Sequence, residues 1–122
     1  MKLLIVAHPD DEIIWFNPER FDRIVIAFCA VPDKPMVEQA RTSAILEHPL
    51  TDRIDFLKLP QSAYWRQDTR LEQHRNNHAQ LERKLARYLQ ESKVTEIFTH
   101  NAQGEYGHFD HILVHDLSLI HI

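Results

Sequence analysis

The fold is decided by the stretch Leu3-Leu4-Ile5-Val6-Ala7-His8-Pro9-Asp10-Asp11-Glu12, in which an apolar run leads directly into a histidine and three acids. A short, uninterrupted apolar run is typical of a strand that is buried on both faces of a sheet. Open α/β sheets bind their ligands at the carboxyl ends of the strands, which is where His8, Asp10 and Asp11 stand. The alternative is a plain strand-to-helix turn, because the helix dipole favours acids at a helix start.

The rest of the chain alternates between strand-like and helix-like segments. We expect strands over residues 23–29, 54–59 and 95–99, and helices over residues 36–47, over residues 71–90 and from about Asp110. This alternation indicates an α/β fold with a mainly parallel, Rossmann-like sheet flanked by helices. A dinucleotide site is not expected, because no glycine-rich loop follows the first strand. Residues 13–16 should form a short helix or turn packed on the sheet, and Tyr64 and Trp65 should cap the core or line a site.

Two helical faces can be assigned from their periodicity. Apolar positions on the helix over residues 36–47 share one face, as they do on the helix over residues 71–90. The first face holds Val37, Ala40, Ala44 and Ile45, and the second holds Leu81, Leu85, Tyr88 and Leu89. We expect the second face to be buried.

A second cluster of polar side chains lies near the far end of the chain. Gly107-His108-Phe109-Asp110-His111 follows the apolar run over residues 97–99, which ends at His100. Two strand ends could therefore bring His8, Asp11 and one of these late histidines together. Two imidazoles and one carboxylate with an open position form a common catalytic zinc arrangement.

Three further histidines have helical spacing. His115 lies four residues after His111 and is a conceivable ligand, although a supporting or surface position is favoured. His74 and His78 are also four residues apart, but they stand among Arg75, Asn76 and Asn77. We interpret them as a solvated helix face.

Taken together, the two clusters resemble the signatures of the PIG-L/LmbE-like zinc-dependent N-acetylglucosaminyl deacetylases. An A-H-P-D-D-E signature matches residues 7–12 completely, and an H-P-D-H signature matches His108, Asp110 and His111, with Phe109 in place of proline. The resemblance extends to about Asp116. It implies an LmbE-like fold, a Zn²⁺ cofactor and removal of an acetyl group from an N-acetylated amino sugar or its conjugate.

The resemblance also implies a role for each motif residue. Glu12 is expected to anchor a helix start, and Arg41 stands where family members often carry an arginine, so it could contact substrate or be a solvated helix arginine. The implied zinc ligands are His8, Asp11 and His111, with Asp10 as general base, a protonated His108 stabilising the oxyanion and Asp110 orienting His108.

Composition limits the remaining possibilities. The chain has 122 residues, 43% of them hydrophobic and 26% charged, which suits one small soluble domain. A net charge of −4 does not suggest a nucleic-acid surface, and no apolar stretch is long enough to span a membrane. The single Cys29 lies in an apolar run and should be buried, which fits a reducing, cytoplasmic setting. We expect a small-molecule substrate.

The end of the chain has an unusual sequence. Residues 117–122 are the in-frame translation of CTG-TCT-CTT-ATA-CAC-ATC, the end of a widely used transposon sequencing adapter. We therefore expect residues 1–116 to be a partial deacetylase-like domain, incomplete at its C-terminus, and residues 117–122 to be a non-native tail. The alternatives to a sugar deacetylase are a zinc amidase acting on a different amide, a metal-binding module without catalysis, and an inactive fragment.

Overall fold

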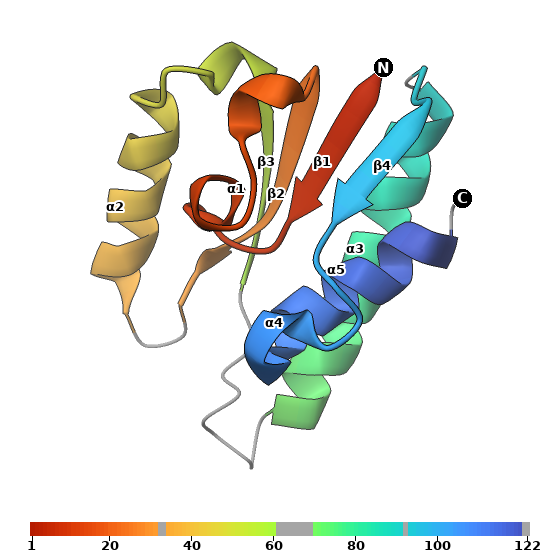
Figure 1. Ribbon diagram of the computed structural model, residues 1–122. Coiled ribbons are helices and arrows are strands. Elements are labelled where there is room, and N and C mark those ends of the chain that lie inside the picture. The colour runs from red at the N-terminus through yellow and green to blue at the C-terminus, as the bar shows by residue number, and fades with distance from the viewer. Residues whose placement is uncertain (32–33, 61–69, 92, 121–122) are drawn as a thin grey trace.

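The computed structural model describes residues 1–31, 34–60, 70–91 and 93–120, which form an α/β fold around a parallel sheet (Figure 1). Its strands lie in the order β3-β2-β1-β4. Beside β1 the strand order reverses, and such a switch point is where open α/β sheets bind ligands. The prediction of a Rossmann-like, parallel sheet is confirmed. The strands are β1 (Lys2–Val6), β2 (Arg23–Ala30), β3 (Ile54–Pro60) and β4 (Glu96–Thr99).

The strand β1 is buried on both faces because helices cover the sheet from both sides. Leu3 and Ile5 pack on one face with α3 (Arg70–Glu91) and α5 (Phe109–Ile120). Leu4 and Val6 pack on the other face with α2 (Pro35–Leu46). Figure 1 shows these helices on opposite sides of the sheet. An uninterrupted apolar run, rather than an alternating one, is what such a strand requires.

The remaining elements are single turns. They are α1 (Asp11–Ile14), η1 (Pro18–Arg20), η2 (Thr51–Arg53) and α4 (Gly104–Gly107). The α1 turn corrects an expectation, because Ile13 and Ile14 are 60% and 61% exposed and do not pack on the sheet. One helical turn cannot aim four consecutive apolar residues inward, and only Phe16 of this run is half-buried against the core.

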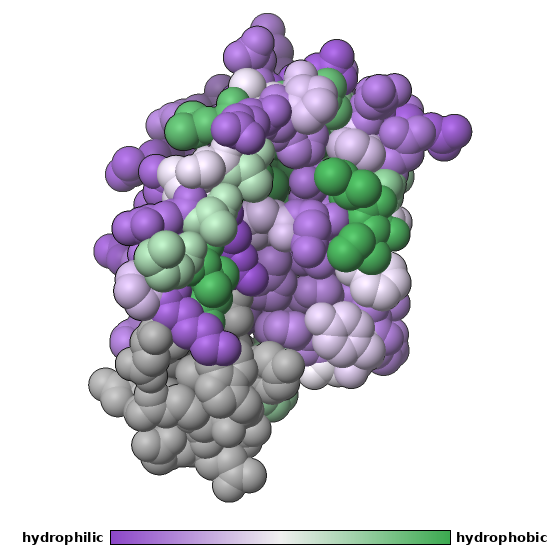
Figure 2. Space-filling view, turned by 90° about the vertical axis from the view of Figure 1, so that its left-hand side faces the viewer, coloured by the Kyte–Doolittle hydropathy of each residue, from purple (hydrophilic) through white to green (hydrophobic). Residues whose placement is uncertain are grey.

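The two predicted helical faces differ in the structure. Leu81 and Leu85 on α3 are fully buried, as expected, with Tyr88 and Leu89 packed beside them. On α2, however, only Ile45 is buried, and Ala40 and Ala44 are exposed. Figure 2, which looks onto the α2 side, shows hydrophobic patches set in a mainly hydrophilic surface.

Several smaller expectations can be compared with the structure. Cys29 is buried, as predicted. The helix α5 continues to Ile120, into the expected tail over residues 117–122, and Leu117 and Ser118 of this segment are buried. Tyr64 and Trp65 lie outside the described residues. Among the residues described, every helix is too short or too polar to cross a membrane.

The core on the α3 side should dominate the stability of the fold. Replacing the fully buried Leu85 by alanine should lower the free energy of unfolding by about 2–5 kcal/mol, because it removes apolar contacts and leaves a cavity. The matched change Leu46→Ala, on a residue that is 71% exposed, should alter it by less than about 0.5 kcal/mol. Urea unfolding followed by circular dichroism measures both. Equal losses in the two variants would contradict this packing.

Candidate metal centre

The candidate site is formed where β1 and β4 end side by side. His8 follows β1 and His100 follows β4, and these two strands are hydrogen-bonded neighbours. The α1 turn then supplies Asp11, and the first turns of α5 supply Asp110 and His111. All five side chains are buried. The parallel sheet thus brings together polar residues from opposite ends of the chain.

The carboxylate of Asp11 lies at the centre of this cluster. Its Oδ2 accepts a hydrogen bond from the backbone N–H of His8 at 2.8 Å. The same oxygen lies 3.3 Å from His8 Nδ1 and 3.2 Å from His111 Nε2. Burial alone would raise the pKa of Asp11, but the hydrogen bonds from His111 and His8 outweigh it and hold this pKa well below its usual range. Asp11 is therefore a buried, ionised carboxylate.

The two histidines respond in the opposite direction. Burial tends to lower the pKa of His8, whereas hydrogen bonds to Asp11 and Asp110 raise it, and the net effect is a rise. For His111, burial is likewise outweighed by the hydrogen bond to Asp11 and by its charge, so that its pKa is also raised. The cluster without a metal ion is thus a set of charge-assisted hydrogen bonds.

The outer nitrogen of each of these two imidazoles contacts a second carboxylate. His8 Nε2 lies 2.9 Å from Asp110 Oδ2, and His111 Nδ1 lies 2.8 Å from Glu105 Oε2. These contacts fix both rings so that the remaining nitrogen faces Asp11. Metal-binding histidines are usually oriented in this way by a carboxylate on the far nitrogen.

The donor atoms of His8, Asp11 and His111 suit a metal ion. One atom from each of the three residues lies within 4.8 Å of the other two. Tetrahedral zinc with bonds of about 2.0–2.2 Å needs neighbouring donors about 3.3 Å apart, and the two contacts to Asp11 measure 3.3 and 3.2 Å. Two overlapping groups, namely His8 with His108 and Asp110, and His100 with Glu105 and His111, also have suitable spacing. These buried groups could hold a metal ion.

Among the late histidines, the hydrogen bonds distinguish His111 from His100. The backbone N–H of Ala7 donates to His100 Nε2 at 3.0 Å, so the ring proton is on Nδ1, which lies 3.2 Å from Glu105 Oε1. Burial, together with the nearby His111, lowers the pKa of His100 to about 4. Both nitrogens of this neutral ring are engaged, and the ring stacks on His111 with centroids 3.8 Å apart.

The three histidines with helical spacing lie outside the ligand set or outside the described side chains. His115 Nδ1 lies 2.6 Å from the carbonyl oxygen of His100 and supports the end of β4, in agreement with its predicted supporting role. His78 is about half exposed and lies 3.6 Å from Glu82 on the same helix. The side chain of His74 lies outside the described residues.

The prediction makes His108 a protonated donor, whereas its surroundings in the metal-free structure favour a neutral ring. Its Nδ1 accepts the backbone N–H of Asp110 at 3.1 Å, so the neutral ring carries its proton on Nε2. Burial and the nearby charge of His8 lower the pKa of His108 to about 4, and the ring is neutral at pH 7. Asp110 positions this ring through its main chain, while its carboxylate hydrogen bonds to His8.

Asp10 and Glu12 flank Asp11 but behave differently. Asp10 is exposed at the start of α1 with φ 99°, a left-handed backbone that non-glycine residues rarely adopt. Partial burial and the charge of Asp11 raise the pKa of Asp10. Glu12 is buried, and its Oε2 accepts the backbone N–H of Asp10 at 3.0 Å, which confirms that it anchors the helix start. Its other oxygen lies 3.3 Å from His48 Nε2, without hydrogen-bond geometry.

A groove of about 720 Å³ runs from Asp10 along the α2 side. Its walls come from residues 9–13 and from α2 and the turn that follows it. Arg41 lies in this wall, half-buried, and donates to the carbonyl oxygen of Cys29 at 3.0 Å. Arg41 is therefore not a fully solvated helix arginine. The exposed Ala40 and Ala44 also line the groove, so this face of α2 borders the groove instead of the core.

Glu105 is a site residue that the sequence reasoning missed. It accepts hydrogen bonds from His111 Nδ1 and from the backbone N–H of Asn101, while its own N–H donates to Asn101 Oδ1 at 2.9 Å. Its backbone has φ 62°, and it follows Gly104 at φ 66°. A Cβ at Gly104 would come within 2.9 Å of Ile112. The sequence feature that could have indicated Glu105 is its position between the two glycines of the chain, Gly104 and Gly107.

The fold and this cluster define the chain as an α/β protein with a buried group of histidines and carboxylates that could hold a metal ion. No family model matches the chain. An uncharacterized protein of Acanthamoeba polyphaga mimivirus is 30% identical over 118 residues, which cover 90% of this chain and 52% of that protein. The chain thus spans about half the length of the curated relative it matches.

The neutral His108 predicts a specific pH dependence. Its folded pKa of about 4 lies below the unfolded value of 6.5, so its contribution to stability is complete above pH 6.5 and is lost as pH falls toward 4. In His108→Asn the amide oxygen can still accept the N–H of Asp110 but does not titrate. Between pH 6.5 and about 4.5 the parent chain should lose about 1–2 kcal/mol more unfolding free energy than this variant.

Urea unfolding of both chains, with a chelator present and at several pH values, measures this difference. His100 titrates in both chains, so its contribution cancels in the comparison. Parallel stability curves for the two chains would show that His108 is not buried as a neutral ring.

Proposed function

We propose that the chain carries the metal-binding site of a zinc-dependent amide hydrolase. This enzyme would remove the acetyl group from an N-acetylated amino sugar or its conjugate. The observation that supports this most is the pair of imidazoles that face one carboxylate, each ring being held from behind by a second carboxylate. The resemblance of both sequence clusters to the PIG-L/LmbE-like deacetylases supplies the choice of reaction.

His8, Asp11 and His111 would hold the zinc ion. These two nitrogens and one oxygen leave a position open, as in catalytic rather than structural zinc sites. When bound, zinc would supply Lewis acidity to the amide carbonyl and lower the pKa of water. Asp110 and Glu105 would keep the ligand nitrogens aimed at the ion, and such outer partners typically contribute about 10–100-fold to metal affinity.

Asp10 would act as the general base. It is the exposed acid beside the ligand Asp11, and its pKa is raised, which brings it closer to the range in which a base is effective at neutral pH. Its backbone, at φ 99°, lies in the left-handed region. Backbone strain of this kind is often retained at functional sites. Asp10 would take a proton from the attacking water and pass it toward the leaving amine.

His108 would stabilise the oxyanion as a neutral donor. Because its Nδ1 is occupied by the N–H of Asp110, its Nε2 carries the proton and can donate a hydrogen bond. The ring lies 4.8 Å from that of His8 and 4.9 Å from that of His111, measured between centroids, so it borders the ligand set. A donor fixed in advance of the reaction is worth more than one that must reorient.

Two aromatic rings beside the cluster favour a sugar over other amides. Tyr106 is 67% exposed, and its ring lies 5.6 Å from that of His111. Trp15 is 44% exposed, and its ring lies 6.4 Å from that of Tyr106. Exposed rings at the edge of a polar site suit the apolar face of a pyranose, because they offer a broad contact at little entropic cost. The groove that holds Arg41 could take the rest of a conjugate.

The neighbouring acids provide a matched test. Asp11→Asn should greatly weaken zinc binding, because it removes a charged ligand, whereas Asp10→Asn should bind zinc like the parent chain. Asp10→Asn should lower turnover of N-acetylglucosamine by about 10²–10⁴-fold, the usual contribution of a general base. Calorimetry with zinc and an assay of released amine measure the two properties, with circular dichroism to confirm folding. Equal loss of zinc affinity in both variants would refute the assigned roles. Zinc binding without turnover in the parent chain would favour a metal-binding module.

Trp15 provides a test of the substrate class. Trp15→Ala should raise KM for N-acetylglucosamine by about 2–10-fold, while KM for an acyclic N-acetyl amine stays unchanged, since only the sugar offers a ring face. Trp15→Phe, which keeps an aromatic surface, should retain most of the affinity. If KM for both substrates rises together, the aromatic pair does not recognise the sugar, and a different amide becomes the better proposal.

A further inference from the structure

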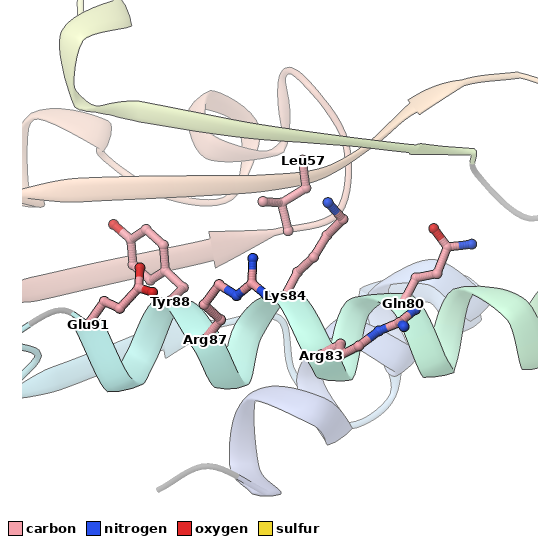
Figure 3. Close-up of a pocket in the computed structure, with 7 residues that line it drawn as sticks. All are labelled: Leu57, Gln80, Arg83, Lys84, Arg87, Tyr88 and Glu91. Atoms are coloured by element: carbon pink, nitrogen blue, oxygen red, sulfur yellow. The ribbon is translucent and has the colours of Figure 1, made fainter.

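A second groove, of about 510 Å³, lies between α3 and β3 (Figure 3). It shares no residue with the candidate metal centre or with the groove beside α2. Because β3 is the last strand of the described sheet on that side, the groove is at a sheet edge. Leu57 and Tyr88 supply its apolar surface, and Arg83, Lys84 and Arg87 supply its charge.

Within the part of the chain that the structure describes, the three cations in this groove are not neutralised. All three side chains are exposed, and none has an ion pair or hydrogen bond with any residue that the structure describes. The nearby acid Asp55, on β3, is already paired with Arg23 at 2.6 Å. One carboxylate, that of Glu91, lines the groove, and Figure 3 shows it at the end marked by Tyr88.

Ordinary helix electrostatics does not account for this arrangement. Cations stabilise a helix when they lie in its last turn, and the last turn of α3 contains no basic residue. Arg83 and Arg87 are four residues apart on one face, and such like-charged pairs destabilise a helix by a few tenths of a kcal/mol. Lys84 adjoins the same groove, so that three cations line it together. A ligand that neutralises the three cations would explain it.

The geometry of the side chains indicates which ligand chemistry fits. Figure 3 shows Lys84 and Arg87 rising from α3 toward the strand that carries Leu57, while Arg83 lies along the helix toward Gln80. Guanidinium groups bind phosphate through paired hydrogen bonds, and an ammonium adds a point charge. Leu57 and Tyr88 beside them would contact an apolar ring or chain.

We propose that this groove is a binding site for a phosphate-bearing small molecule, with the phosphates held by Arg83, Lys84 and Arg87 and the organic part placed on Leu57 and Tyr88. The site is independent of the proposed deacetylase chemistry, since it uses none of its residues. Its ligand would be a diphosphate or phosphate ester rather than a membrane, because the groove is bordered by a strand edge and the cations line a single concave surface.

Binding of inorganic pyrophosphate and of a nucleoside diphosphate tests the proposal. The full chain is first treated with a chelator, so that phosphate oxygens cannot bind through a metal ion, and each compound is then titrated by calorimetry. Both should bind, and the nucleoside diphosphate should bind more tightly because its ring can contact Leu57 and Tyr88. In Lys84→Gln/Arg87→Gln both affinities should fall by at least about tenfold.

The control is Arg20→Gln/Arg75→Gln, which changes the net charge equally at two exposed residues outside the groove. It should change affinity by less than about twofold, since neither side chain lines the groove and salt screens exposed charges. If both double variants lose affinity equally, general charge attraction explains the binding and the proposal fails. If the parent chain binds neither compound, the site is excluded. Groove-dependent cosedimentation with phosphatidylglycerol vesicles, without binding of the soluble phosphates, would also overturn the proposal.

Discussion

The site depends on the pairing of one buried carboxylate, that of Asp11, with the groups around it. A charge in the interior is tolerated only when it is paired and hydrogen bonded, and Asp11 has the N–H of His8 and two imidazoles as partners. Those imidazoles in turn need partners, which Asp110 and Glu105 provide. The end of β1, the loop after β4 and the start of α5 are thereby held against one another. Removal of any one partner would leave another buried polar group unsatisfied.

Much of this arrangement could be predicted from the sequence, because the polar residues come directly after apolar strands. An apolar run leading into His8 and Asp11, and a second one leading into His100, require only that the two strands be neighbours in a parallel sheet. The β1–β4 pairing meets that requirement. The order of strands could not be read from the apolar runs themselves, since periodicity gives the faces of each element and not its neighbours.

The parts that could not be predicted depend on local backbone geometry and on tautomers. Glu105 reaches His111 because its own backbone, in a single turn, has a positive φ angle. The loop sequence indicates such a conformation only through the two nearby glycines. The neutral state of His108 depends on a backbone N–H that points at its ring, which motif spacing cannot specify. Residues 13–16 are apolar and are therefore expected to pack on the sheet, whereas α1 is too short to form a buried face and leaves Ile13 and Ile14 exposed.

The contact between His8 and Asp110 has a kinetic consequence, because these residues are 102 positions apart in sequence. Bringing such distant segments together costs loop-closure entropy, so long-range contacts of this kind tend to form late and to slow folding. During synthesis the cluster cannot be assembled until His111 has emerged, since Asp11 and His111 are 100 residues apart in the sequence. Until α5 docks, the apolar face of the sheet that Leu113, Val114 and Leu117 cover would stay exposed, and exposed apolar surface is what makes a partly folded chain prone to aggregate.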